Sequence, residues 1–204
     1  MNYEAKDLPY GQFEKLGMSR KDVLGMAPEE LKSLLSGKTT GLQDLRVIEQ
    51  ETKIRVKARL SLQRLSDGSL NLVIHPVRNK IKNDDNLSQA QLDSLKNGER
   101  VIAARTSLNG EKELYLFQLD RETNEIYKVR QNSITIPRHL MEVELSPQQR
   151  SDLLLGKTIR LEDKAGNVHE VAVDLIDRKG YSVKTMERVL EPERIVNNQQ
   201  GIKR

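Results

Sequence analysis

The sequence lacks cysteine and tryptophan, and aromatic residues make up only 3% of its 204 residues. The absence of cysteine excludes disulfides, thiolate zinc sites and cysteine nucleophiles, and it fits a reducing compartment such as the cytoplasm. With so few rings, the core must be built from leucine, isoleucine and valine. Aromatic platforms that stack the bases of single-stranded nucleic acid are correspondingly disfavoured.

Long apolar runs are also missing. No segment approaches the roughly 20 apolar residues of a membrane helix, and the polar start lacks the apolar centre of a signal peptide. We therefore expect a cytoplasmic protein with no membrane partner. The formal net charge of +4, from 34 basic and 30 acidic residues, is too small to indicate an anionic partner by itself. The distribution of charge along the chain is more informative.

Residues 1–42 predict a helical N-terminal subdomain of short helices. Pro9 and Pro28 stand where a first helical turn accepts proline. Ser19 with Asp22 predicts a capped helix start, and Gly37 predicts a left-handed helix end.

Residues 43–86 predict a basic β-hairpin followed by a polar linker. From Lys53 onward, charged and apolar residues alternate with a period of two, which is typical of a half-buried strand. The apolar pattern selects a three-residue turn at 66–68 with Gly68 left-handed. This register places Leu60 opposite Ile74 and His75 beside Arg59.

The rest of the chain carries an internal duplication. LSQAQLDSLKNG at 87–98 is echoed by LSPQQRSDLLLG at 145–156, and each is followed by three strand-like segments. We expect two helix-plus-antiparallel-meander units, at 87–137 and 138–188, then a polar tail at 189–204. The fold class is therefore α+β. Gly98 and Gly156 are predicted to end their helices with positive φ.

A weaker echo, LKSLLSGK, occurs at 31–38. It is either a third, degenerate copy of the unit or one more leucine-rich helix that ends in glycine, and both interpretations stay open.

The sequence shows no catalytic or cofactor-binding constellation, so we expect a protein that is not an enzyme and has no cofactor. Two Gly-Lys-Thr tripeptides, at 37–39 and 156–158, lack the upstream glycine of a phosphate-binding loop and follow helices instead of preceding them. The three histidines are scattered over separate segments without ligand-type neighbours, which disfavours a metal site.

One surface is a candidate for function, namely the basic strand face at 53–59. Same-face residues on a strand repeat every ~6.6 Å, a spacing that suits successive phosphates. Other basic residues lie close by in sequence or in the hairpin register. The candidate nucleic-acid-binding residues are Lys53, Arg55, Lys57, Arg59, Arg64, His75 and Arg78. The alternative is that these cations serve solubility and edge protection.

The segment ARLSLQRLSDGSLNLVIHPVR at 58–78 resembles an uncharacterised domain family of Bacteroidetes. The resemblance extends to LPYGQFEKLGMSRKDV at 8–23, LDRETNEI at 119–126 and SPQQRSDLLLGK at 146–157. It implies an accessory protein of conjugative or mobilisable elements that is associated with topoisomerase III-like proteins. The resemblance supplies no catalytic residue and no known ligand.

Two functions follow from the sequence. The first is a non-enzymatic accessory protein that associates with DNA or RNA through the basic strand face. The second is a protein–protein interaction module that docks onto a topoisomerase-like or relaxase-like enzyme through its strand edges.

Overall fold

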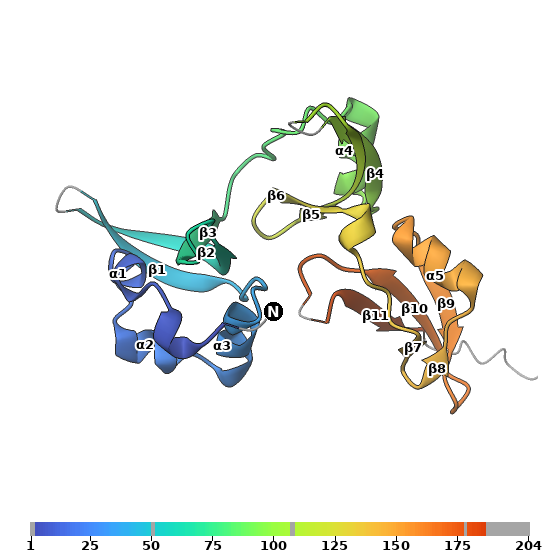
Figure 1. Cartoon of the computed structure of the whole chain (residues 1–204), viewed down its shortest axis with the longest axis horizontal. Helices are drawn as coiled ribbons and strands as arrows, with labels where there is room; N and C mark the ends of the chain where they lie inside the picture. Colours follow the sequence, from blue (N-terminus) through green and yellow to red (C-terminus); the bar gives the residue numbers. More distant parts are fainter. Residues whose placement is uncertain (1–2, 50–51, 107–108, 178, 187–204) are drawn as a thin grey trace, which may run out of the picture.

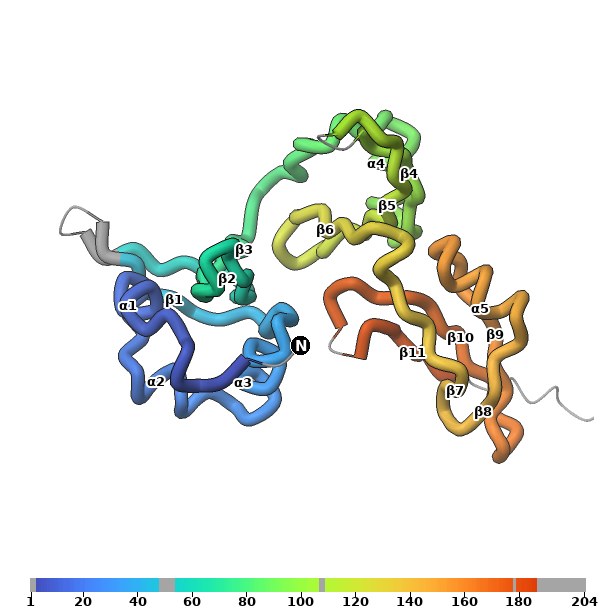
Figure 2. The backbone as a smooth tube through the Cα atoms, viewed as in Figure 1, coloured from blue at the N-terminus to red at the C-terminus, as the bar shows by residue number. Residues whose placement is uncertain are grey.

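The computed structural model describes residues 3–49, 52–106, 109–177 and 179–186. They form three lobes along an arc, each built on a three-stranded antiparallel sheet whose strands follow chain order (Figure 1). The backbone trace runs through the lobes in sequence order (Figure 2). Within the described part of the chain, none of the helices is long and apolar enough to span a membrane.

Lobe 1 (residues 3–78) combines short helices with the first sheet. Its elements are η1 (Ala5–Asp7), α1 (Tyr10–Glu14), α2 (Arg20–Leu24), α3 (Pro28–Leu35), β1 (Gln43–Glu49), β2 (Thr52–Arg64) and β3 (Leu70–Pro76). Phe13, Val23 and Leu34 of the helices pack with Leu45 and Leu60 of the sheet in one core. The core therefore continues across the boundary predicted at residue 42. Strand β1 was not predicted.

The β2–β3 hairpin has the predicted register. Leu60 pairs with Ile74, and Arg59 pairs with His75. The Leu65 amide donates to the Ser69 carbonyl at 2.9 Å, which closes the three-residue turn, and Gly68 has a φ of 86°. The prediction from apolar pattern and turn chemistry is thus confirmed.

Lobes 2 and 3 each contain a helix followed by a three-stranded meander. Lobe 2 contains α4 (Gln89–Lys96), β4 (Val101–Thr106), β5 (Lys112–Asp120), β6 (Glu125–Arg130) and η2 (Gln131–Ser133). Lobe 3 contains β7 (His139–Leu140), β8 (Val143–Glu144), α5 (Pro147–Leu154), β9 (Ile159–Glu162), β10 (Val168–Val173) and β11 (Tyr181–Thr185). The α+β class and the helix-plus-meander order are confirmed. The predicted tail at 189–204 lies outside the described residues.

The middle strands of the two units do not end at the same sequence motif. Asp-Arg occurs at 120–121 and again at 177–178, which predicts equivalent strand ends. However, β10 ends at Val173, and the Asp174 amide donates to the Gly180 carbonyl at 3.0 Å. Asp174 therefore occupies the place of Asp120, and Asp177 lies within the following loop.

The lobes share cores unequally. Leu116 of β5 is fully buried in the cluster formed by Leu153, Ile159 and Val171 of lobe 3. The other face of the β4–β6 sheet packs on α4 around Phe117. Lobe 1 keeps its own separate core. Lobes 2 and 3 are therefore one apolar assembly, to which lobe 1 is attached by other means.

All three main helices end in the same way. α3, α4 and α5 are each eight residues long, and a left-handed glycine stands two positions after the last helical residue. In each case the next amide donates back to a carbonyl five residues upstream, at 2.9 to 3.0 Å. The glycines are Gly37, Gly98 and Gly156. The positive φ predicted for the last two is confirmed. Lobe 1 also has the helix, glycine and meander order of a third copy.

We predict that Gly156→Ala destabilises the protein more than Gly98→Ala. Both replacements put a side chain at positive φ, which costs about 1 kcal/mol. A Cβ at 156 would also lie 2.7 Å from the Leu116 Cδ1 atom, whereas at 98 it would meet only the flexible end of Arg121. Urea unfolding should show losses of about 1 kcal/mol for Gly98→Ala and about 2 to 3 kcal/mol for Gly156→Ala. Equal losses would contradict the close approach at Leu116.

Candidate functional site

The candidate surface is built on β2, which two partners share. β1 pairs with its first half, from Thr52 to Ala58, and β3 with its second half, from Ala58 to Arg64. The first half of β2 and β1 thus form a two-stranded ribbon that extends beyond β3 (Figure 1). One face of this sheet packs on the helices of lobe 1, and we call the opposite one the outer face.

Three exposed cations lie on the outer face of the ribbon, and we call them the ribbon cluster. They are Arg46, Arg55 and Lys57. Arg46 and Arg55 are direct cross-strand partners, and Asp44 stands opposite Lys57. Lys53 belongs to the same strand, but its side chain lies outside what the structure describes.

Within the described part of the chain, no ion pair neutralises the ribbon cluster. Like charges directly opposite each other on paired strands are destabilising. Among the described residues, no ion pair or hydrogen bond of an Arg46, Arg55 or Lys57 side chain is present. The cluster therefore keeps its hydrogen-bond donors and its charge available to an external anion.

Arg59, which belongs to the same basic strand face, makes its contacts within the protein. Its Nε donates to Asp120 Oδ2 at 2.7 Å, its Nη1 donates to the Thr40 carbonyl at 3.1 Å, and its Nη2 pairs with Glu122. The side chains of Arg59 and Asp120 are only 12% and 4% exposed. The β5–β6 turn and its acidic residues thus cover this end of the basic strand face. Arg59 therefore connects lobe 1 to lobe 2.

His75 and Arg78 both contact Glu125, the first residue of β6. His75 Nδ1 lies 2.9 Å from Glu125 Oε1, and Arg78 Nη1 donates to Glu125 Oε2 at 2.9 Å. The His75 ring packs against Tyr127, with 5.3 Å between ring centroids. Burial, followed by the charge of Glu125, raises the pKa of the Tyr127 hydroxyl above its usual range, which keeps that ring neutral. Both side chains are thus engaged in contacts with lobe 2.

Ser61 completes a serine–histidine–carboxylate sequence, because its hydroxyl lies 2.9 Å from His75 Nε2. This order of groups activates serine nucleophiles in hydrolases. Here, however, Ser61 lies inside a paired strand, and not at the strand-to-helix turn that presents a nucleophile beside two backbone amides. Glu125 is also shared with Arg78. The arrangement bridges two lobes and satisfies a buried histidine.

Arg64 lies on the opposite face of the sheet from the ribbon cluster. Its guanidinium stands over the Tyr3 ring, 5.3 Å from the centroid, and its Nη1 donates to the Gly68 carbonyl at 2.9 Å. Of the seven predicted residues, the structure therefore leaves Arg55 and Lys57 together on the outer face of the ribbon.

Sequence reasoning missed Arg46, which joins Arg55 and Lys57 on that face. The segment 43–47 alternates polar and apolar residues, which was a usable strand signal.

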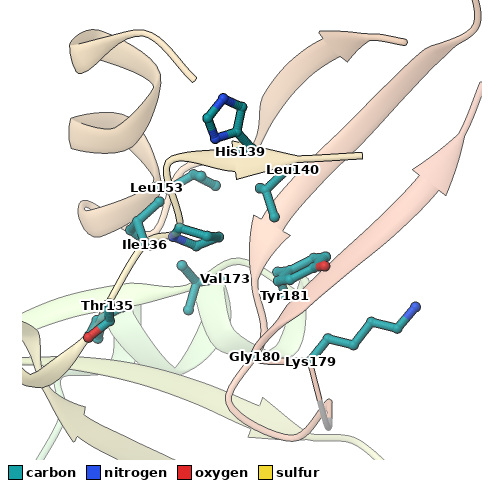
Figure 3. A pocket seen from close by; sticks show the side chains of 11 residues that line it. Thr135, Ile136, His139, Leu140, Leu153, Val173, Lys179, Gly180 and Tyr181 are labelled. Atoms are coloured by element: carbon teal, nitrogen blue, oxygen red, sulfur yellow. The ribbon is translucent and has the colours of Figure 1, made fainter. Parts of the chain in front are cut away.

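A pocket with a volume of about 350 Å³ lies elsewhere, in lobe 3. Ile136, Leu140, Leu153, Val173 and Tyr181 are among the side chains that line it (Figure 3). Its lining is mostly apolar, and His139 of β7 is exposed. Throughout the described ranges, no group of three or more His, Asp or Glu side chains is placed to hold a metal ion.

Residues 3–86 match a family model described as a protein of unknown function (DUF4099). This segment is similar to an uncharacterised domain. The match covers lobe 1 and the linker and stops immediately before lobe 2. The expected resemblance to an uncharacterised family is confirmed for these residues. No curated protein and no solved structure matches the chain.

We predict that Arg59→Gln destabilises the protein, whereas Arg55→Gln does not. Removing Arg59 leaves the buried Asp120 carboxylate without its ion-pair partner, which costs about 3 to 5 kcal/mol. Arg55 is exposed and makes no described contact, so its replacement should change stability by less than about 0.5 kcal/mol. Urea unfolding monitored by circular dichroism measures both.

The double variant Arg59→Gln/Asp120→Asn provides the control for this comparison. It should lose less stability than the sum of its two single variants, because the unpaired charge is gone. Additive losses would show that Arg59 and Asp120 do not interact.

Proposed function

We propose that the protein is a non-enzymatic nucleic-acid-associated factor whose ribbon cluster contacts backbone phosphates. The observation that supports this most is the cross-strand pair Arg46–Arg55, which carries two exposed like charges in direct register. Such a pair costs stability in the free protein. A bound phosphate would neutralise both guanidinium groups.

The geometry of the cluster supports contact with a polyanion. Arg55 and Lys57 alternate on β2 and are therefore about 6.6 to 6.8 Å apart along the strand. Arginine forks bind phosphate oxygens bidentately, and lysine adds a point charge. Asp44 is the one described carboxylate in register with these cations, so the surface stays positive.

An accessory role in a mobile genetic element, beside a topoisomerase-like or relaxase-like enzyme, belongs to the same proposal. It is supported by the resemblance of the quoted segments alone.

We predict that Arg46→Gln/Arg55→Gln/Lys57→Gln weakens binding to nucleic acid while leaving the fold intact. Each lost phosphate contact should lower the magnitude of the slope of log K against log salt by about 0.7 to 0.9. Fluorescence anisotropy with a labelled oligonucleotide, at salt concentrations from about 50 to 200 mM, measures the slope. The melting temperature is the folding control.

The matched control is Lys112→Gln/Arg160→Gln/Lys184→Gln. It removes the same charge from exposed positions on β5, β9 and β11. It should bind almost as the wild type does. Equal losses in both variants would reduce the effect to net charge. A wild-type protein that binds no nucleic acid at about 50 mM salt would leave partner docking as the better account.

A further inference from the structure

We infer that the β1–β2 ribbon enters the major groove of duplex DNA with its outer face toward the bases. This inference rests on the proposed function and names the form of nucleic acid. It is carried by the dimensions of the ribbon, by the support behind it and by the chemistry of its outer face.

The width and length of the ribbon suit the major groove of DNA. Six residue pairs, from Asp44 with Lys57 to Glu49 with Thr52, lie beyond the last β3 pair at Ala58 and make it two strands wide. Its length is about 20 Å, at about 3.4 Å per residue. The major groove is about 12 Å wide and admits a two-stranded antiparallel ribbon. A full three-stranded sheet would be too broad.

The ribbon is supported on one face and one edge, which leaves the outer face open. Leu45, next to Arg46, is buried in the core of lobe 1 with only 1% of its surface exposed. The Arg46 amide donates to the Leu16 carbonyl at 3.1 Å, so the outer edge of β1 is tied to the loop after α1. A Cβ on Gly17 would lie 2.7 Å from the Arg46 carbonyl oxygen. This close approach holds the strand that carries Arg46 in place.

The outer face offers side chains that read base edges in the major groove. Arginine donates bidentately to guanine O6 and N7, and aspartate accepts from the cytosine amino group. Arg46 and Arg55 lie in the middle of the ribbon, with Asp44 one same-face position from Arg46. The cations can therefore contact phosphates or guanines, and the carboxylate is tolerated where a cytosine is present.

Unpaired bases find no platform on this surface. Residues 43–64, which include all of β1 and β2, contain no phenylalanine, tyrosine or tryptophan. Most of the affinity of sequence-tolerant single-strand binders comes from aromatic stacking together with a charged groove. A basic ribbon without aromatic rings favours a duplex, whose bases are already stacked on one another.

The test compares three forms of one duplex. The first is unmodified, the second carries a glucosylated hydroxymethyl group at C5 of every cytosine, and the third is saturated with netropsin. The sugar fills the major groove and the drug fills the minor groove. We expect the sugar to weaken binding by about tenfold or more, since it blocks the base edges. Netropsin should leave the affinity nearly unchanged, and the isolated single strand should bind more weakly than the duplex.

A charge-preserving variant separates groove contact from phosphate contact. Arg46→Lys/Arg55→Lys keeps the net charge, so its salt slope should match that of the wild type. It removes both guanidinium forks, and the discrimination against the glucosylated duplex should shrink with them.

The failures of the two proposals have different signatures. Equal affinity for all three duplexes, or tighter binding of the single strand, would overturn the groove assignment. If the triple glutamine variant still lowered the salt slope, phosphate contact would stand. A wild-type protein that binds neither duplex nor single strand would overturn both.

Discussion

The position of lobe 1 depends on a buried ion pair. Arg59 of β2 meets Asp120 at the end of β5, and the two are among the least exposed charged side chains described. Around them Glu122, Glu125 and Arg78 add further charged contacts, whereas the core of lobe 1 stays separate from the cores of the other lobes. The junction is therefore held by directed polar contacts. Such contacts require correct geometry, because an unpaired charge at this depth is costly.

The same ion pair divides the basic strand face at 53–59 into two parts with different roles. Arg59 and His75 contact Asp120 and Glu125, the carboxylates at the facing ends of β5 and β6, while Arg55 and Lys57 remain exposed on the ribbon. Arginine binds carboxylates and phosphates in the same way, through charge-assisted and often bidentate hydrogen bonds. One strand can thus hold a neighbouring lobe with one half and present unneutralised charge with the other.

Local signals in the sequence were sufficient for much of the fold. The capping box of Ser19 and Asp22 that begins α2, the glycine ends of α4 and α5 and the three-residue hairpin turn were all predicted from the sequence and are present. Strand parity would also have placed Arg64 on the core face, because it is in phase with Leu60 and Leu62. The contact between Arg59 and Asp120 was out of reach, since 61 residues separate them and no local pattern links them. Proximity of this kind is set by how lobes pack, which a single sequence does not display.

The unequal sharing of cores gives the chain an order of assembly during synthesis. Lobe 1 can bury its apolar residues once its own segment has left the ribosome, since the helices and β1–β3 complete its core. Lobe 2 cannot do so, because Leu116 is covered by Leu153 and Val171, which are synthesised later. The face of the β4–β6 sheet that carries Leu116 therefore stays uncovered until β10 has been synthesised. In this interval the nascent chain exposes an apolar sheet face, the kind of surface that chaperones protect from aggregation.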